Sequence, residues 1–410
     1  MISRKEKIDI IIFPILDISL NGANYFFHIF ISWYLLPKDY GMLNSILSVL
    51  TILLVVGISF QTYVAKYVSK NGMEEFRIFY IIKCAILFFV FFASIVLIFI
   101  PNLIEAIQYN GTMLLLIFIF GINILLSIFR GIFQGRKSFF LLNISFYIEM
   151  GFKIAAIATL FVYCPTINTI LVSILIGMII ALIHGIYMNR QYLIFNKNVF
   201  TGGISKNIIG QLSNIYTANF FFNFFTSVDM IIVNYYLPQS SGVYAIVLKY
   251  NQLLTFASNS IYTVFLPLLS ERSRNKKGFK KCIFILFVVM LAVSFLALIV
   301  YKFIMPATIE IFFTHEYSSA KNYLFLGIIS YILLNFVFMI ININIVIDRS
   351  FYLIILFISS IAFIFGIAAF HKDIYMILYV EIVFYGILLL FVAVDMLRNL
   401  FAKKEFYLND

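Results

Sequence analysis

Charged residues and cysteines are scarce in this sequence. Asp, Glu, Lys and Arg together make up 11% of its 410 residues, and the three cysteines, Cys84, Cys164 and Cys282, are scattered through apolar segments. That spacing provides neither a disulfide framework nor a zinc site. Enzyme motifs are also missing, because the sequence has no Ser-His-Asp set, no phosphate-binding glycine loop and no metal-ligand spacing among its four histidines. We therefore expect a protein that is not an enzyme and holds no metal.

Long hydrophobic runs are what the sequence does contain. Hydrophobic residues form 63% of the chain, and they recur in segments of about 20 residues, the length that an α-helix needs to cross a bilayer. These segments are too long and too uniformly apolar for the strands of a membrane barrel. We predict an all-α integral membrane protein with twelve transmembrane helices, at 8–36, 42–66, 79–100, 110–129, 139–163, 167–188, 208–236, 242–269, 282–304, 322–347, 351–370 and 374–397.

The basic residues give a net charge of +11, but their positions argue against a nucleic-acid partner. On the predicted topology, 23 of the 29 lysines and arginines lie at the termini and in alternate loops, all on one side of the membrane. Basic loops stay in the cytoplasm, so both termini are predicted to be cytoplasmic. The first apolar segment lacks a small-residue cleavage site, and we expect no cleavable signal peptide.

One segment of the first half recurs in the second half. Residues 31–41 (ISWYLLPKDYG) align with residues 232–242 (IVNYYLPQSSG) at an offset of 201. Leu-Pro-x-x-x-Gly is also a common hairpin turn in membrane proteins, but an offset of about half the chain favours a duplication. Six-helix repeats are a recurrent transporter architecture. We predict an N-terminal six-helix lobe at residues 1–200 and a C-terminal one at residues 201–410.

Polar residues in the predicted helices concentrate on the first two helices of each half. Polar groups are costly in lipid and should face protein or water. Placed at 100° per residue they form stripes, which we expect to face one another across a hydrated cavity. Single Asn, Ser and Thr residues also serve as interhelical contacts, worth about 1 kcal/mol or less each. The predicted substrate-binding and translocation residues are Asp17, Asn21, Asn24, His28, Lys66, Lys153, Asn223, Asp229, Lys249, Gln252 and Asn259.

Ionisable residues inside a membrane are functional candidates by default. Glu149 and Lys153 are four residues apart on one helix, so mutual neutralisation and a functional role are equally open. Asp229 and Lys249 lie at similar depths on either side of a proline turn and can also form a pair. Glu381, in the last predicted helix, is a less secure candidate.

Three segments resemble the polysaccharide-biosynthesis flippases of the Wzx type. Residues 34–45 (YLLPKDYGMLNS) look like the end of their first helix, and residues 130–136 (RGIFQGR) are similar to their RGxxQG segment. Residues 227–245 (SVDMIIVNYYLPQSSGVYA) resemble their seventh helix. With the helix count, the likeness extends over essentially the whole chain. The ordered set is typical of the MOP exporter superfamily, which also contains the MATE multidrug antiporters.

The resemblance implies a MATE-like fold and a function. The protein would move undecaprenyl-pyrophosphate-linked glycan repeat units across a bacterial cytoplasmic membrane by alternating access, before their polymerisation into O-antigen, capsule or a related glycan. Membrane lipids, a glycan polymerase and a chain-length regulator are the implied partners. No cofactor is implied beyond coupling H⁺ or Na⁺, for which Asp17 is a candidate carrier. Lys249, assisted by Lys66, is expected to hold the diphosphate.

Two other interpretations stay open at this point. One is a MATE-type drug/cation antiporter, which predicts an acidic excess among the polar stripes. The stripes instead contain acids, lysines and a histidine together. The other is a non-transporting scaffold of a glycan assembly complex, which predicts stripes without charge.

Overall fold

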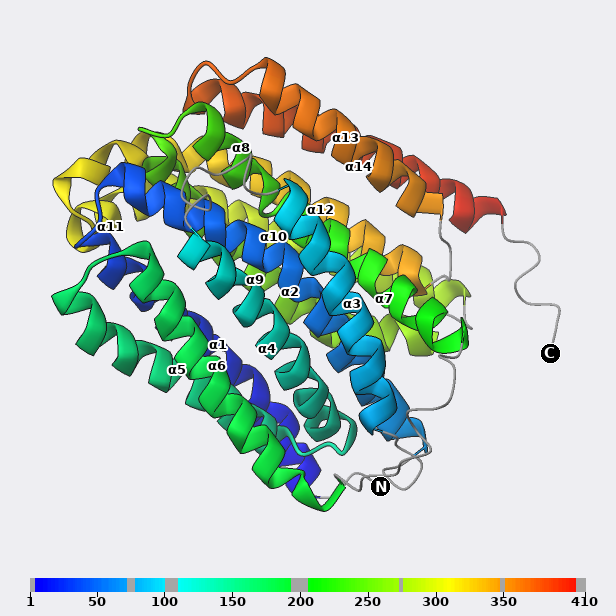
Figure 1. Cartoon of the computed structure of the whole chain (residues 1–410). Helices are drawn as coiled ribbons and strands as arrows, with labels where there is room; N and C mark the ends of the chain where they lie inside the picture. The colour runs from blue at the N-terminus through cyan, green and yellow to red at the C-terminus, as the bar shows by residue number, and fades with distance from the viewer. Residues whose placement is uncertain are drawn as a thin grey trace. The chain divides into compact units, whose positions relative to one another are not determined.

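In its described part, the computed structural model is built of helices (Figure 1). No strand occurs in the described part of the chain, so the prediction of an all-α protein is confirmed. The residues that the structure describes are 4–71, 78–99, 110–192, 206–272, 276–346 and 351–402.

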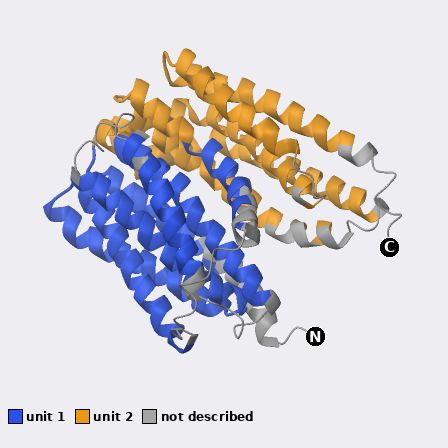
Figure 2. Cartoon of the chain, turned by 45° about the vertical axis from the view of Figure 1, so that its right-hand side comes forward, with its two compact units in different colours: residues 1–35, 42–227 blue, residues 36–41, 228–410 orange. Residues whose placement is uncertain are grey.

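The chain divides into two compact units (Figure 2). Unit 1 consists of Met1–Leu35 and Met42–Ser227, and unit 2 of Leu36–Gly41 and Val228–Asp410. The sequence-based division at residues 200 and 201 stays a prediction. It differs from these units in the assignment of residues 201–227 and of the short segment Leu36–Gly41.

Unit 1 is built on α1 and on the helices that pack beside it. α5 packs closely on α6 and on α1, and α4 packs on α6. The helices of this unit are α1 (Arg4–Ser32), α2 (Pro37–Asn71, from Met42 onward), α3 (Ile78–Phe99), α4 (Asn110–Gly135), α5 (Phe139–Tyr163), α6 (Ile167–Met188), the short 3₁₀ helix η3 (Arg190–Tyr192) and α7 (Lys206–Phe225).

Unit 2 is centred on α12, which packs against α9, α10 and α14. α13 lies beside α14 and α8. The helices of this unit are α8 (Val228–Tyr236), α9 (Ser241–Arg272), α10 (Lys276–Phe303), α11 (Met305–Phe312), the 3₁₀ helix η5 (His315–Asn322), α12 (Leu324–Val346), α13 (Phe351–Ala369) and α14 (Ile374–Ala402), together with the first turn of α2.

The described part of the chain contains eight helices that are long and apolar enough to cross a membrane. They are α2, α4, α5, α6, α10, α12, α13 and α14, and each coincides with a predicted crossing. The chain is therefore a multi-pass membrane protein. Helices α1, α3 and α9 also coincide with predicted crossings.

The predicted crossing at 208–236 is not one helix, because it breaks between α7 and α8. The Thr226 hydroxyl donates to the carbonyls of Phe222 and Asn223, and the Ser227 N–H bonds to the Phe224 carbonyl in a tightened last turn. The new helix α8 carries Asp229 in its first turn, where the backbone favours a negative charge. The break therefore sets the position of Asp229.

Two glycines of the RGxxQG segment let α4 lie directly on the backbone of α2. A Cβ atom at Gly131 would stand 2.7 Å from the Gln61 carbonyl oxygen, and one at Gly135 would stand 2.8 Å from the Ala65 carbonyl oxygen. The two glycines are four residues apart, which is the spacing of small residues at close helix crossings in membranes. This part of the motif thus has a packing role.

The glycines of the two repeated turns meet within unit 2. A Cβ at Gly41 would lie 1.8 Å from the Ser241 Oγ, and a Cβ at Gly242 would lie 2.0 Å from the Pro37 carbonyl oxygen. Each repeated turn therefore needs glycine because the other turn lies against it. Tyr40 adds a ring contact to Tyr317 of η5, with centroids 5.7 Å apart.

Candidate functional site

Two polar clusters, one in each unit, contain buried or half-buried ionisable side chains of the apolar helices. In unit 1, Lys153 of α5 reaches α1. Its ammonium donates to the Asn24 Oδ1 at 2.9 Å and lies 4.1 Å from the centroid of the Phe27 ring. An amide oxygen and a ring face attract a cation, but neither neutralises its charge. Sequence reasoning selected both Lys153 and Asn24, and the structure brings them into contact.

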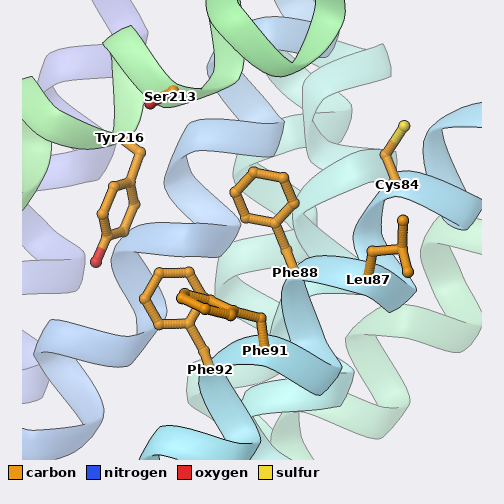
Figure 3. Close-up of a pocket in the computed structure, with 7 residues that line it drawn as sticks. All are labelled: Cys84, Leu87, Phe88, Phe91, Phe92, Ser213 and Tyr216. Carbon is orange, nitrogen blue, oxygen red and sulfur yellow. The ribbon is translucent and has the colours of Figure 1, made fainter. Parts of the chain in front are cut away.

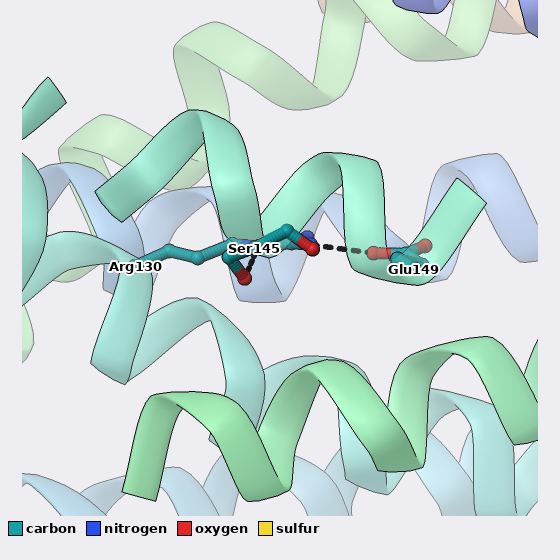
Figure 4. A network of polar contacts seen from close by, with 3 residues as sticks. All are labelled: Arg130, Ser145 and Glu149. Carbon is teal, nitrogen blue, oxygen red and sulfur yellow. Dashed lines mark hydrogen bonds and ion pairs between the residues drawn. The ribbon is translucent and has the colours of Figure 1, made fainter. Parts of the chain in front are cut away.

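The carboxylate of Glu149, which the sequence suggested as a partner of Lys153, forms its ion pair with Arg130. The Arg130 Nη2 lies 2.6 Å from the Glu149 Oε2, and the same guanidinium donates to the hydroxyl and the carbonyl of Ser145 (Figure 4). The ring of Phe146 lies 4.0 Å from the guanidinium carbon. Glu149 and Lys153 therefore form no direct ion pair, because Arg130 from α4 offers Glu149 a closer and multiply hydrogen-bonded partner.

The cluster of unit 2 consists of two carboxyl groups bridged by one tyrosine. Asp229 of α8 accepts hydrogen bonds from the Met230 N–H at 2.8 Å and from the Tyr244 hydroxyl at 2.9 Å. The same hydroxyl contacts the Glu381 Oε1 on α14. Asp229, Tyr244 and Glu381 are all fully buried.

The Tyr244 hydroxyl has one hydrogen to share between two carboxyl groups. If one of these groups is protonated, it can donate its own hydrogen to the phenol oxygen, and both contacts are then full hydrogen bonds. Two buried carboxylates without a cation would also be far costlier than one. The arrangement is thus suited to binding and releasing a proton or a small cation.

Asp229 does not pair with Lys249, as the sequence allowed. Tyr244 and Lys249 are five residues apart on α9, so their side chains leave the helix about 140° apart. Because Tyr244 faces Asp229, the half-buried Lys249 points elsewhere. The prediction of an Asp229–Lys249 pair is wrong for this reason.

The other predicted site residues are placed as follows in the structure. In unit 1, Asn21 is half-buried, His28 is buried with its ring edge-on to Phe27, and Lys66 is exposed on α2. Asn223 bonds to the Asn219 carbonyl of its own helix, as an amide with a structural role does. Gln252 and Asn259 are half-buried on α9. Asp17 lies on α1, but its side chain is outside the described residues. A role of these residues in transport stays a prediction.

A pocket of about 390 Å³ lies between α3 and α7 in unit 1 (Figure 3). Phe88 and Phe92 of α3 face Tyr216 of α7, and the ring centroids of Phe92 and Tyr216 are 5.2 Å apart. Leu87 and Phe91 stand at its exposed side. The lining is mainly apolar and aromatic, and among the described residues it contains the hydroxyl-bearing Ser213 and Tyr216 but no charged side chain.

Sequence reasoning missed Tyr244 and Arg130, the two residues that organise the clusters. Both had a signal in the sequence. Tyr244 is one turn into the predicted helix after the Pro238 turn, and Arg130 opens the RGxxQG segment, although it was counted among the basic residues of a loop. Among the residues that the structure describes, no group of three or more His, Cys, Asp or Glu side chains could hold a metal ion.

Comparison with solved structures gives the fold a known counterpart. A multidrug-resistance MATE transporter of the MOP superfamily in its inward-facing conformation has a TM-score of 0.72 and 12% identity, over 95% of this chain and 99% of that one. An outward-facing MATE transporter of the same superfamily has a TM-score of 0.70 and 12% identity, over 98% and 96%.

A third structure is a MOP superfamily transporter from Pyrococcus furiosus, described as having a binding pocket of reverse polarity that suggests a different function. Its TM-score is 0.67 at 12% identity, over 96% of both chains. No protein-family model matches the sequence, and the search of curated proteins finds no match. The chain thus has the fold of MATE and MOP superfamily transporters, as predicted, and these neighbours are transporters and not enzymes.

Proposed function

We propose that the protein is a flippase for an anionic lipid-linked oligosaccharide, an undecaprenyl-pyrophosphate-linked glycan repeat unit, in a bacterial cytoplasmic membrane. The transporter fold supports movement of a substrate across a membrane by alternating access. The chemistry of the two clusters supports the choice of substrate and the presence of a coupling ion.

The observation that carries the proposal is that Lys153 has no direct ion-pair partner among the described residues. Glu149, the nearest acid on its own helix, is held by Arg130. Among the described residues no carboxylate lies within ion-pair distance of the Lys153 ammonium, whose contacts are Asn24 and Phe27. A cation inside a membrane is costly and usually finds a counter-charge. A diphosphate provides that charge, and the neighbouring amides of α1 suit the hydroxyls of a glycan.

A MATE-type drug/cation antiporter is the second candidate, and the likeness to multidrug transporters favours it. The buried Asp229 and Glu381 are the acids that such a substrate would need. Both, however, already contact Tyr244, which makes them better suited to a proton or a small metal cation than to an organic cation. We assign this acid–tyrosine–acid cluster to coupling, alongside the sequence-based candidate Asp17.

The two functions are separated by transport assays on proteoliposomes. The flippase predicts movement of a labelled undecaprenyl-pyrophosphate oligosaccharide and no efflux of an organic cation. Lys153→Gln should lower the flipping rate by at least about tenfold, which corresponds to about 1.4 kcal/mol of barrier, while Lys153→Arg keeps the charge and should retain part of the rate. The matched control is Lys302→Gln, at an exposed position near the end of α10.

Lys249 forms a second arm of the same experiment. Because Lys249 does not pair with Asp229, a loss of flipping in Lys249→Gln would not be caused by a broken Asp229–Lys249 ion pair, and Lys249→Arg, which keeps the charge, should retain part of the rate. Full flipping by a folded Lys153→Gln, Lys249→Gln protein would refute the anion-binding role. Efflux of the organic cation with no movement of the lipid would support the antiporter function. If neither substrate is transported, the interpretation as a non-transporting scaffold would be supported.

A further inference from the structure

Helix α9 carries a second polar stripe, which is buried inside unit 2. Its members are spaced seven, four, three and four residues apart, so that they lie on one face of the helix. Each is at most 5% exposed. The stripe begins at the acid–tyrosine–acid cluster and spans residues 244–262, about 27 Å along the helix axis. It consists of Tyr244, Asn251, Thr255, Ser258 and Tyr262.

From Asn251 onward the stripe faces α12. A Cβ at Gly327 would lie 2.6 Å from the Asn251 Nδ2, so the amide of Asn251 rests on that glycine. Farther along, the Asn335 Nδ2 donates to the Thr255 Oγ1 at 3.4 Å, and the Tyr262 hydroxyl donates to the Asn335 carbonyl at 2.6 Å. We call this contact the α9–α12 seam. It is lined by protein on both sides and does not face lipid.

Many polar atoms of the seam have no protein partner in the described part of the chain. They are both amide atoms of Asn251, the Ser258 Oγ, the Asn335 Oδ1 and the Tyr331 Oη. A buried polar group left without a hydrogen bond costs about 1–3 kcal/mol, and such groups in native proteins are usually bonded to buried water. A row of them on two facing helices is a site for several waters in line.

One end of the seam reaches the coupling cluster. The Glu381 Oε2 is buried and has no protein hydrogen-bond partner among the described residues. Ser330 lies beside it but donates its hydroxyl hydrogen to the Gly327 carbonyl. The titratable groups that face Glu381 are Asp229 on α8, Tyr244 on α9, Tyr331 on α12 and Tyr385 on α14.

We propose that the α9–α12 seam holds a file of water molecules that conducts protons to and from Glu381. This inference rests on the proposed coupling role of the acid–tyrosine–acid cluster and names H⁺ as its ion. Hydroxyl and amide groups both donate and accept, so they can orient water in either direction. A hydronium in the seam transfers its proton to the Glu381 carboxylate and becomes water, and the reverse step releases the proton. Only O–H bonds form and break.

The presence of water is tested on the full-length protein in nanodiscs by X-ray hydroxyl-radical footprinting in ¹⁸O-labelled water. Radicals made from water inside the protein modify the side chains beside it. Tyr262 and Tyr331 should be modified several-fold faster than Tyr352, a buried tyrosine of α13 outside the seam. Equal, slow modification of all three would mean a dry seam and would overturn the inference.

The proton route is tested by infrared spectroscopy after a pH jump. The signal is the carboxylic-acid C=O band that disappears in Glu381→Gln. In the double variant Asn251→Leu, Asn335→Leu the band should change at least about tenfold more slowly, equal to about 1.4 kcal/mol of barrier. The control is Ser360→Val, a buried position on α13 whose hydroxyl bonds within its own helix.

An unchanged rate in a folded double variant would overturn the inference. If the apolar pair fails to fold, the single variant Asn251→Leu, which removes two of the unpartnered polar atoms, is measured instead, and slowing in that variant decides the question in the same way. Neither measurement uses a transported substrate. A protein that flips no lipid but shows a hydrated, proton-conducting seam would therefore lose the proposed function and keep this inference.

Discussion

At the scale of single residues, the decisive contacts come from side chains that the sequence presents as ordinary. Asp229 was recognisable as an ionisable residue in an apolar helix, but its partner was not. An aspartate with a lysine 20 residues away suggests an ion pair. The partner of Asp229 depends on the direction in which each side chain leaves α9. Tyr244 points to Asp229, and Lys249 does not.

The bridging hydroxyl of Tyr244 is expected to stabilise the fold. Tyr244→Phe removes the donor of Asp229 and the partner of Glu381 and leaves two buried carboxyl groups facing a ring edge. We expect a loss of about 1–3 kcal/mol in the free energy of unfolding, measured by thermal or denaturant unfolding in detergent. Tyr352→Phe is the control, since that hydroxyl has no hydrogen-bond partner in the described part of the chain, and it should change stability by less than about 0.5 kcal/mol. Equal effects would contradict the bridging role.

At the scale of helices, hydropathy located most elements because a membrane crossing is a local property of the sequence. The eight apolar helices coincide with predicted crossings for that reason. The break at Thr226 and Ser227 was missed, because hydroxyl groups bonded to their own backbone leave no gap in hydropathy. The buried stripe of α9 was present in the residue spacing. The stripe predicted on this helix was instead the one with Lys249, Gln252 and Asn259, because residue spacing alone does not tell which of two polar faces is buried.

The close packing of α4 on α2 gives a prediction at this scale. Gly131→Ala places a methyl group 2.7 Å from the Gln61 carbonyl oxygen and 2.8 Å from the Val64 Cβ. The helices must separate, at an expected cost of about 1–3 kcal/mol. Gly151 of α5 is the matched control, since nothing lies within 4 Å of a Cβ there, and Gly151→Ala should be neutral or stabilise by up to about 1 kcal/mol. Unfolding of the two variants in detergent compares them directly, and equal stability would argue against close α2–α4 packing.

At the scale of the whole molecule, the sequence indicated a MATE-like fold through short segments in a fixed order, and the solved structures agree with it at 12% identity. The identity of the substrate cannot be predicted from these segments in the same way. One fold carries many functions, and the groups that select a substrate are single side chains such as Lys153, whose partners depend on neighbouring helices.

The topology is the testable prediction at this scale. In a variant with Ser in place of Cys84, Cys164 and Cys282, a membrane-impermeant maleimide added to intact cells should label a cysteine at position 373 but not one at position 277. The reason is the concentration of basic residues on one side. Permeabilised cells should be labelled at both positions. Strong labelling at 277 in intact cells would invert the placement of every loop.

The close packing of the Gly41 turn on the Gly242 turn has a consequence for fragments of this chain. Unit 2 includes the six residues Leu36–Gly41, which are synthesised long before the rest of the unit. The two segments of unit 2 are therefore synthesised at different times. A fragment that starts at residue 228 lacks the segment Leu36–Gly41, which packs inside this unit. Co-expressed fragments split in the 193–205 region should regain that turn only by association, so the two pieces of a nicked protein should remain together through purification.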